Sequence, residues 1–139
     1  MPKRGSLGKT TRPRLAGILP RKRLFGLLDR GREGPVVWIS GPPGCGKTTL
    51  AASYLDQTGI PCLWYQLDEG DADPATFFYY LRLAAEEMSD AAHEPLPLLA
   101  PEYHAALGVF ARRYFQSLYA LLKPPFAPRA MATICGSAC

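Results

Sequence analysis

The chain has 139 residues and a mass of 15.2 kDa, which gives room for one domain. Hydrophobic residues make up 47% and charged residues 20% of the sequence, a composition typical of a globular protein that excludes wholesale disorder. The apolar runs are far shorter than the roughly 20 residues of a membrane-spanning helix, and no signal peptide is visible. We therefore expect a cytoplasmic protein without a membrane partner.

The net charge of +4 is unevenly distributed along the chain. Residues 1–33 carry ten Lys/Arg and two acids, whereas residues 34–139 carry six Lys/Arg and ten acids. A basic segment of this kind either contacts nucleic acid or a membrane surface, or is a solvated leader. Because residues 3–14 contain no aromatic side chain to stack on a base, we predict that residues 1–13 form a basic flexible leader.

The first half of the chain predicts helices alternating with strands. Leucines at helical spacing after Pro20 indicate a short helix over residues 21–30. The apolar run Pro35–Ser40 predicts a buried strand, and Cys62–Leu67 predicts a second one. Between them, a glycine- and proline-rich loop leads into a helix over residues 47–56. Strands that alternate with helices indicate a parallel sheet.

The second half predicts two further helices. Asp73 is a good N-cap and Pro74 suits the first helical position, so a helix is expected to start there. Apolar residues repeat at three and four positions over Tyr103–Leu122, which predicts the clearest helix of the chain. We expect its apolar stripe to cover the sheet rather than to face a partner.

One motif indicates a specific chemistry. Residues 41–48, Gly-Pro-Pro-Gly-Cys-Gly-Lys-Thr, match the phosphate-binding pattern G-x-x-x-x-G-K-[ST] at every fixed position. Gly44 and Gly46 can adopt backbone angles that turn successive N–H groups inward into an anion nest, and the helix that follows adds its positive dipole end. The predicted nucleotide-binding residues are Gly41, Pro42, Pro43, Gly44, Cys45, Gly46, Lys47, Thr48 and Thr49.

The side chains of this loop have separate expected roles. Lys47 is expected to reach the β- and γ-phosphates, and the Thr48 hydroxyl to bind Mg²⁺, which makes Thr48 the predicted metal ligand. Thr49 is placed to donate to the α-phosphate. Pro42 and Pro43 restrict the loop, so less entropy is lost when phosphate orders it. The expected cofactors are therefore ATP or ADP with Mg²⁺.

The acidic loop at residues 68–74 allows two interpretations. Asp68 and Glu69 follow an apolar strand, as does the Mg²⁺-directing carboxylate of P-loop enzymes. Gln66 interrupts that apolar run, however, and this strand is the next one after the P-loop helix. A helix-capping role is therefore favoured over a metal site, and the catalytic residues stay unknown.

Three blocks of sequence carry a family resemblance: Arg12–Leu15 with Pro20–Leu24, Val37–Leu50, and Trp64–Leu81. They resemble the N-terminal NTPase region of MalT-like, LuxR-type ATP-dependent transcriptional activators, which belong to the STAND class of signalling ATPases. The third block is the most discriminating, because an acidic loop running into an aromatic helix is characteristic of that family. The resemblance covers roughly residues 12–122.

The resemblance also implies a fold, of which residues 14–122 are expected to supply the N-terminal part. It implies an α/β fold, an incomplete P-loop NTPase in which residues 14–122 supply the N-terminal part of a parallel sheet with flanking helices and only the first two strands are present. It further implies that the P-loop binds ATP or ADP and that Arg21 or Arg23 lies near the base. In that family the strand bearing the Mg²⁺-directing aspartate follows the helix equivalent to Tyr103–Leu122.

The end of the chain departs from the family pattern. Residues 123–139 contain three prolines, no periodicity and no acid, so we predict an irregular tail. We hypothesise a truncated or frame-shifted product of a longer gene, and we expect ATP hydrolysis to be very weak or absent. A missing general base alone costs about 10²–10⁴ in rate.

Three functions remain open at this point. The leading interpretation is an ATP- or ADP-binding fragment of a STAND-type regulatory ATPase. A small P-loop nucleotide kinase is the alternative, although the arginines after Lys47 are not grouped in a glycine-rich lid loop. An inactive gene product or a non-enzymatic interaction module is the third. DNA binding is not expected of this fragment, and its protein partners are unknown.

The four cysteines fit no zinc pattern and are expected to be reduced thiols.

Overall fold

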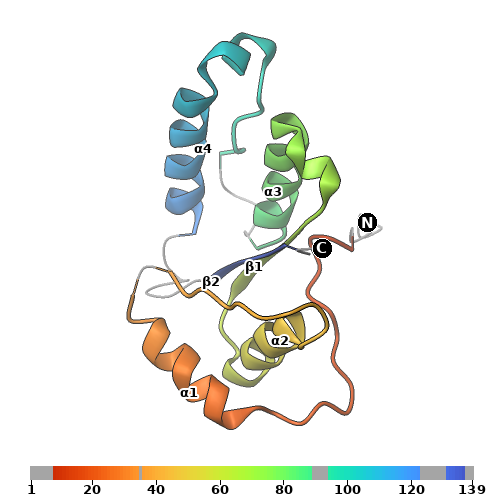
Figure 1. Cartoon of the computed structure of the whole chain (residues 1–139). Helices are drawn as coiled ribbons and strands as arrows, with labels where there is room; N and C mark the ends of the chain where they lie inside the picture. The colour runs from red at the N-terminus through yellow and green to blue at the C-terminus, as the bar shows by residue number, and fades with distance from the viewer. Residues whose placement is uncertain (1–7, 35, 89–93, 123–130, 137–139) are drawn as a thin grey trace, which may run out of the picture. The chain divides into compact units, whose positions relative to one another are not determined.

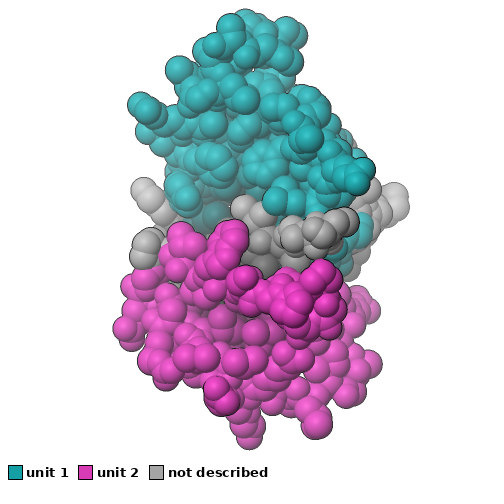
Figure 2. All heavy atoms as spheres, in the orientation of Figure 1, with its two compact units in different colours: residues 1–12, 61–136 teal, residues 13–60, 137–139 magenta. Residues whose placement is uncertain are grey.

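The computed structural model describes most of the chain (Figure 1), namely residues 8–34, 36–88, 94–122 and 131–136. The chain divides into two compact units (Figure 2). Unit 1 comprises residues 1–12 and 61–136, and unit 2 comprises residues 13–60 and 137–139. The described residues are mostly helical, and none of their helices is long and apolar enough to cross a membrane.

Unit 2 contains two helices, both of which the sequence predicts. Helix α1 spans Lys22–Gly31 and helix α2 spans Lys47–Thr58. Helix α2 ends where Gly59 adopts a left-handed conformation, with φ of +63°, and its N–H bonds to the Leu55 carbonyl. Glycine is favoured here because other residues pay a steric cost at positive φ.

The side chain of Tyr54 fixes α1 to α2. Its ring is fully buried and packs edge-on against Phe25 of α1, with ring centroids 5.4 Å apart. Its hydroxyl donates to the Asp29 carboxylate at 2.5 Å and accepts from the Arg32 guanidinium at 3.0 Å. The two helices are thus joined by one aromatic contact and a chain of hydrogen bonds.

Residues 36–40, which precede the glycine-rich loop, do not form the strand that the sequence predicts at Pro35–Ser40. The side chains of Val36 and Trp38 are 75% and 86% exposed. A strand needs a neighbour to accept its backbone hydrogen bonds, and no described residue pairs with this segment. Without a pairing strand, Val37 and Ile39 are only partly buried. Pro35 itself lies outside the described residues.

Unit 1 is built from a strand pair and two helices, with two short 3-10 turns. Their bounds are Cys62–Leu67 (β1), Glu69–Ala72 (η1), Pro74–Met88 (α3), Pro101–Ala106 (η2), Leu107–Leu121 (α4) and Met131–Gly136 (β2). The predictions of β1 and of a helix starting at Pro74 are confirmed. The helix predicted from Tyr103 begins instead as η2 and becomes α-helical at Leu107.

The core of unit 1 is an aromatic cluster between α3 and α4. Phe78 lies at its centre, with its ring 4.9 Å from Phe110 and 4.8 Å from Tyr114 of α4. Leu63 and Tyr65 of β1 belong to the same buried cluster. The apolar stripe of α4 therefore packs against α3, whose Phe78 lies between the two helices. The stripe is buried within the chain, although its ring contacts are with α3 rather than with a sheet.

Strand β2 corrects the prediction of an irregular tail. It pairs in parallel with β1, in a register that runs from Cys62 opposite Met131 to Leu67 opposite Gly136. The segment gave no periodic signal because it is short and rich in small residues, with Thr133 and Ile134 its β-branched members. Residues 123–130 and 137–139 lie outside the described residues.

The α/β prediction is therefore confirmed only in part. The described residues contain the expected helices and one parallel strand pair, but the second strand is β2 rather than residues 36–40. The wider parallel sheet of a P-loop NTPase is not seen among them.

The predicted flexible leader is wrong for its described part. Residues 8–12 belong to unit 1, where the Lys9 carbonyl accepts a hydrogen bond of 2.7 Å from the Gln66 N–H of β1. Thr10 is only 5% exposed. Residues 1–7 lie outside the described residues.

We predict that Phe78→Ala destabilises the protein by about 3–5 kcal/mol, because it removes a buried ring and leaves a cavity in the α3–α4 cluster. Chemical denaturation followed by circular dichroism measures the loss. Tyr79→Ala, at a neighbouring position that is 49% exposed, serves as the control and should cost much less. Equal losses for the two variants would contradict the assigned core.

Candidate phosphate-binding site

Two glycines of the glycine-rich loop of unit 2 adopt left-handed backbone conformations. Gly44 and Gly46 adopt φ values of +77° and +86°, which side-chain-bearing residues rarely tolerate. Gly46 is the N-cap of α2, and no side chain caps the helix there. The first N–H groups of a helix have no acceptor within the helix. The loop therefore leads directly into a helix N-terminus, the arrangement that the sequence predicts.

Lys47 folds back over the loop that precedes it. Its Nζ donates to the carbonyl oxygens of Gly41 at 2.8 Å and Pro42 at 3.1 Å, and lies 4.0 Å from the Cys45 Sγ. The Cys45 N–H in turn bonds to the Pro42 carbonyl at 3.3 Å. These contacts hold the ammonium group against the first two residues of the loop.

The structure divides the nine predicted binding residues between the loop and the start of α2. Residues 41–46 form the loop, and Lys47, Thr48 and Thr49 form the first turn of α2. The loop from Gly41 to Gly44 is exposed. Cys45 and Cys62 are thiols rather than disulfides, as the sequence analysis expects.

A second cation lies at this loop. The family resemblance implies that Arg21 or Arg23 lies near the base of a bound nucleotide, and that expectation stays a prediction. In the structure the Arg21 guanidinium donates to the Cys45 carbonyl at 3.3 Å, so it lies against the glycine-rich loop. Its sequence signal was only its position at the N-cap of α1, and such a position does not reveal a contact across 24 residues.

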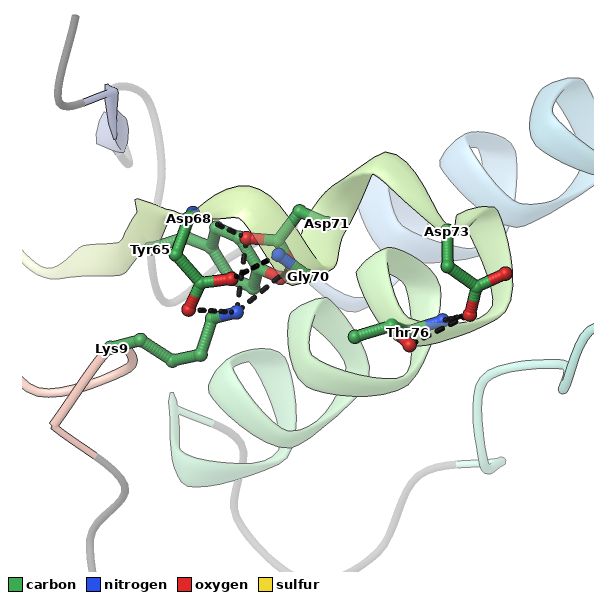
Figure 3. Close-up of polar contacts among 7 residues, drawn as sticks. All are labelled: Lys9, Tyr65, Asp68, Gly70, Asp71, Asp73 and Thr76. Carbon is green, nitrogen blue, oxygen red and sulfur yellow. Dashed lines mark hydrogen bonds and ion pairs between the residues drawn. The ribbon is translucent and has the colours of Figure 1, made fainter. Parts of the chain in front are cut away.

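The acidic loop after β1 forms a second polar cluster, in unit 1 (Figure 3). The Asp71 side chain is 4% exposed and accepts from Lys9 Nζ at 2.9 Å, from the Tyr65 hydroxyl, and from the Asp68 N–H at 2.8 Å. Lys9 also pairs with Asp68 at 2.9 Å and lies over the Tyr80 ring. The cluster ties residue 9 to the end of β1.

These contacts shift the pKa values of the groups involved. Burial alone would raise the pKa of Asp71, but hydrogen bonds from Tyr65, the Asp68 N–H and Lys9 outweigh it and lower that pKa. Burial would lower the pKa of Lys9, but its bonds to Asp68 and Asp71 raise it. Burial and the Asp71 carboxylate raise the pKa of Tyr65. Asp71 and Lys9 are thus both held in their charged forms.

The acidic loop caps two helical segments. Asp68 accepts from the Gly70 N–H at 2.9 Å and caps η1. Asp73 accepts from the N–H of Thr76 at 3.0 Å and from its hydroxyl at 2.7 Å, at the start of α3 (Figure 3). Among the described residues, no three His, Cys, Asp or Glu side chains lie close enough to hold a metal ion. The helix-capping interpretation of this loop is confirmed.

Comparison with known proteins agrees with the family resemblance. The chain matches the family described as Nephrocystin 3, N-terminal over residues 18–130, and it belongs to that family. It also resembles HTH-type transcriptional regulators named MalT. The regulator from Vibrio cholerae is 35% identical over 124 residues, and the one from Cronobacter sakazakii is 31% identical over 121 residues.

The chain is short relative to these regulators. The two alignments cover 88% and 85% of this chain but only 12% and 13% of the relatives' own lengths. A third MalT regulator, from Vibrio campbellii, is 32% identical over 124 residues with the same small share, 12%, of its length. No solved structure matches the chain significantly.

We predict that Asp71→Asn lowers the free energy of unfolding at neutral pH by about 1–3 kcal/mol, because hydrogen bonds to a charged group are lost. The lowered pKa of Asp71 means that its contribution is complete above its ordinary value of 3.8 and is lost as the pH falls through the folded-state pKa. The difference between wild type and variant should therefore shrink in acid. Denaturation curves at neutral pH and well below pH 3.8 measure it.

Glu69→Gln, in the same loop but exposed, is the matched control and should change stability little at either pH. The raised pKa of Lys9 gives the opposite pH dependence. The contribution of Lys9 to the free energy of unfolding is complete below its ordinary pKa of 10.5 and is lost as the pH rises through the folded-state pKa. A pH-independent effect of Asp71→Asn would contradict the charged pair.

Proposed function

We propose that the chain binds ATP or ADP through residues 41–49 and that it is the nucleotide-binding part of a regulatory ATPase similar to the MalT regulators. The observation that carries the proposal is the backbone of the loop. Gly44 and Gly46 stand at positive φ directly before an uncapped helix N-terminus. Such a loop offers N–H groups and a positive dipole end to a phosphate.

The charge of the loop supports a polyphosphate ligand. Lys47 Nζ is held by two neutral carbonyl oxygens at 2.8 and 3.1 Å. Hydrogen bonds between an ammonium and a phosphate are charge-assisted and roughly twice as strong as those to neutral acceptors. A bound phosphate therefore competes well with the carbonyls for this lysine, and the loop pre-positions it.

Two threonines in the first turn of α2 would bind the metal and the α-phosphate. Thr48 is the second residue of α2 and carries the hydroxyl that would ligate Mg²⁺, and Thr49 carries the hydroxyl for the α-phosphate. Mg²⁺ would neutralise charge on the bound phosphates. Hydrolysis stays predicted to be very weak or absent, so the function is nucleotide binding.

The relatives support a regulatory context. They are named HTH-type transcriptional regulators, and this chain aligns with about an eighth of their length. We propose that nucleotide binding by residues 41–49 serves a regulator of that kind. DNA binding is not part of the proposed function of these 139 residues.

We predict that Lys47→Ala weakens ATP and ADP binding by about 10- to 100-fold, the factor expected from losing a charge-assisted hydrogen bond. Equilibrium titration of fluorescent ATP and ADP with Mg²⁺ into the full chain measures the affinity. Lys22→Ala removes an exposed lysine outside the loop and is the matched control, with unchanged affinity. A folded wild type that binds neither nucleotide would overturn the proposed function.

A further inference from the structure

The guanidinium of Arg21 covers the last peptide of the phosphate loop. Its Nη1 donates to the Cys45 carbonyl at 3.3 Å. Its Nη2 lies 3.0 Å from the point that a Cβ atom on Gly46 would occupy. The glycine at this position therefore gives the arginine room to lie directly against the backbone that enters α2.

Helix α1 positions Arg21 at the loop. It is the N-cap of α1, and its carbonyl accepts from the N–H groups of Leu24 and Phe25 at 2.9 and 3.0 Å. Helix α1 is fixed to α2 by the contacts of Tyr54 with Phe25 and Asp29. The backbone of Arg21 is thus held at the loop by the same packing that defines unit 2.

Two cations therefore approach the loop at two separate points. Lys47 rests on the carbonyls of Gly41 and Pro42, and Arg21 rests on that of Cys45. Both contacts are exposed to solvent, so burial does not hold either cation in place. A guanidinium has five N–H donors in a planar fork that matches phosphate oxygens, and a single neutral carbonyl uses one of them.

We infer that Arg21 is a second cationic ligand for the diphosphate of the bound nucleotide, acting with Lys47. This inference rests on the proposed function. It assigns Arg21 to the phosphates, whereas the family resemblance implied a place near the base. Arg21 contributes affinity that depends on the phosphate chain and not on the base.

Inorganic pyrophosphate separates the two roles because it has phosphates and no base. The experiment titrates pyrophosphate and ATP, each with Mg²⁺, into the full chain, with affinity measured by calorimetry. Arg21→Gln keeps a neutral N–H donor for the Cys45 carbonyl but removes the charge and the fork. It should weaken both ligands by a similar factor of about 10- to 100-fold.

Two further variants complete the test. Arg21→Lys restores the charge and should recover part of the affinity for both ligands. Arg30→Gln removes an exposed arginine in the last turn of α1 and should bind both ligands as the wild type does. Thermal unfolding of each variant identifies any that fails to fold, and Arg21→Lys then carries the comparison.

The outcomes that would overturn the inference are distinct. Loss of ATP affinity with unchanged pyrophosphate affinity assigns Arg21 to the base, and unchanged affinity for both ligands removes it from the site. If Lys47→Ala still weakens ATP binding as predicted when Arg21 behaves in either of these two ways, the proposed function stands. If the wild type binds neither ligand, the proposed function fails together with this inference.

Discussion

The buried carboxylate of Asp71 is the point on which unit 1 depends, because three parts of the chain meet there. It binds Lys9 from the N-terminal segment, Tyr65 from β1 and the Asp68 N–H from the turn that leads to α3. A carboxylate so little exposed is tolerable only when its charge is matched by a cation and by hydrogen-bond donors. The acidic loop thus joins the N-terminal segment to the end of β1 and to the turn that leads into α3.

Two cations lie on the loop at residues 41–46 of unit 2, and they reach it in different ways. Lys47 directly follows the loop in the sequence. Arg21 lies far from it in the sequence and is held there because the hydrogen bond of Tyr54 to Asp29 fixes α1 to α2. Local sequence therefore places one cation, and helix packing places the other.

Much of the local structure could be predicted because short-range physics decides it. The N-cap Asp73, the proline after it and the continuous apolar run Cys62–Leu67 each act within a few residues. Strand pairing could not be predicted in this way. Residues 36–40 have the apolar pattern of a strand but no described neighbour to pair with. Residues 131–136 lack a periodic pattern, yet they form β2 because β1 pairs with them. Within the site the loop residues followed from the motif, while the Arg21 contact depends on tertiary packing.

The exposed segment at residues 36–40 has a consequence for the chain as a molecule in solution. Val36 and Trp38 are exposed, and no strand of the described residues pairs with this segment. Such a segment resembles an unprotected sheet edge, which is a template for pairing with another chain. It ends directly before Gly41, the first residue of the loop. If the proposed function holds, a strand that pairs with this segment also fixes the residue before the loop, and strand pairing and nucleotide binding then favour each other.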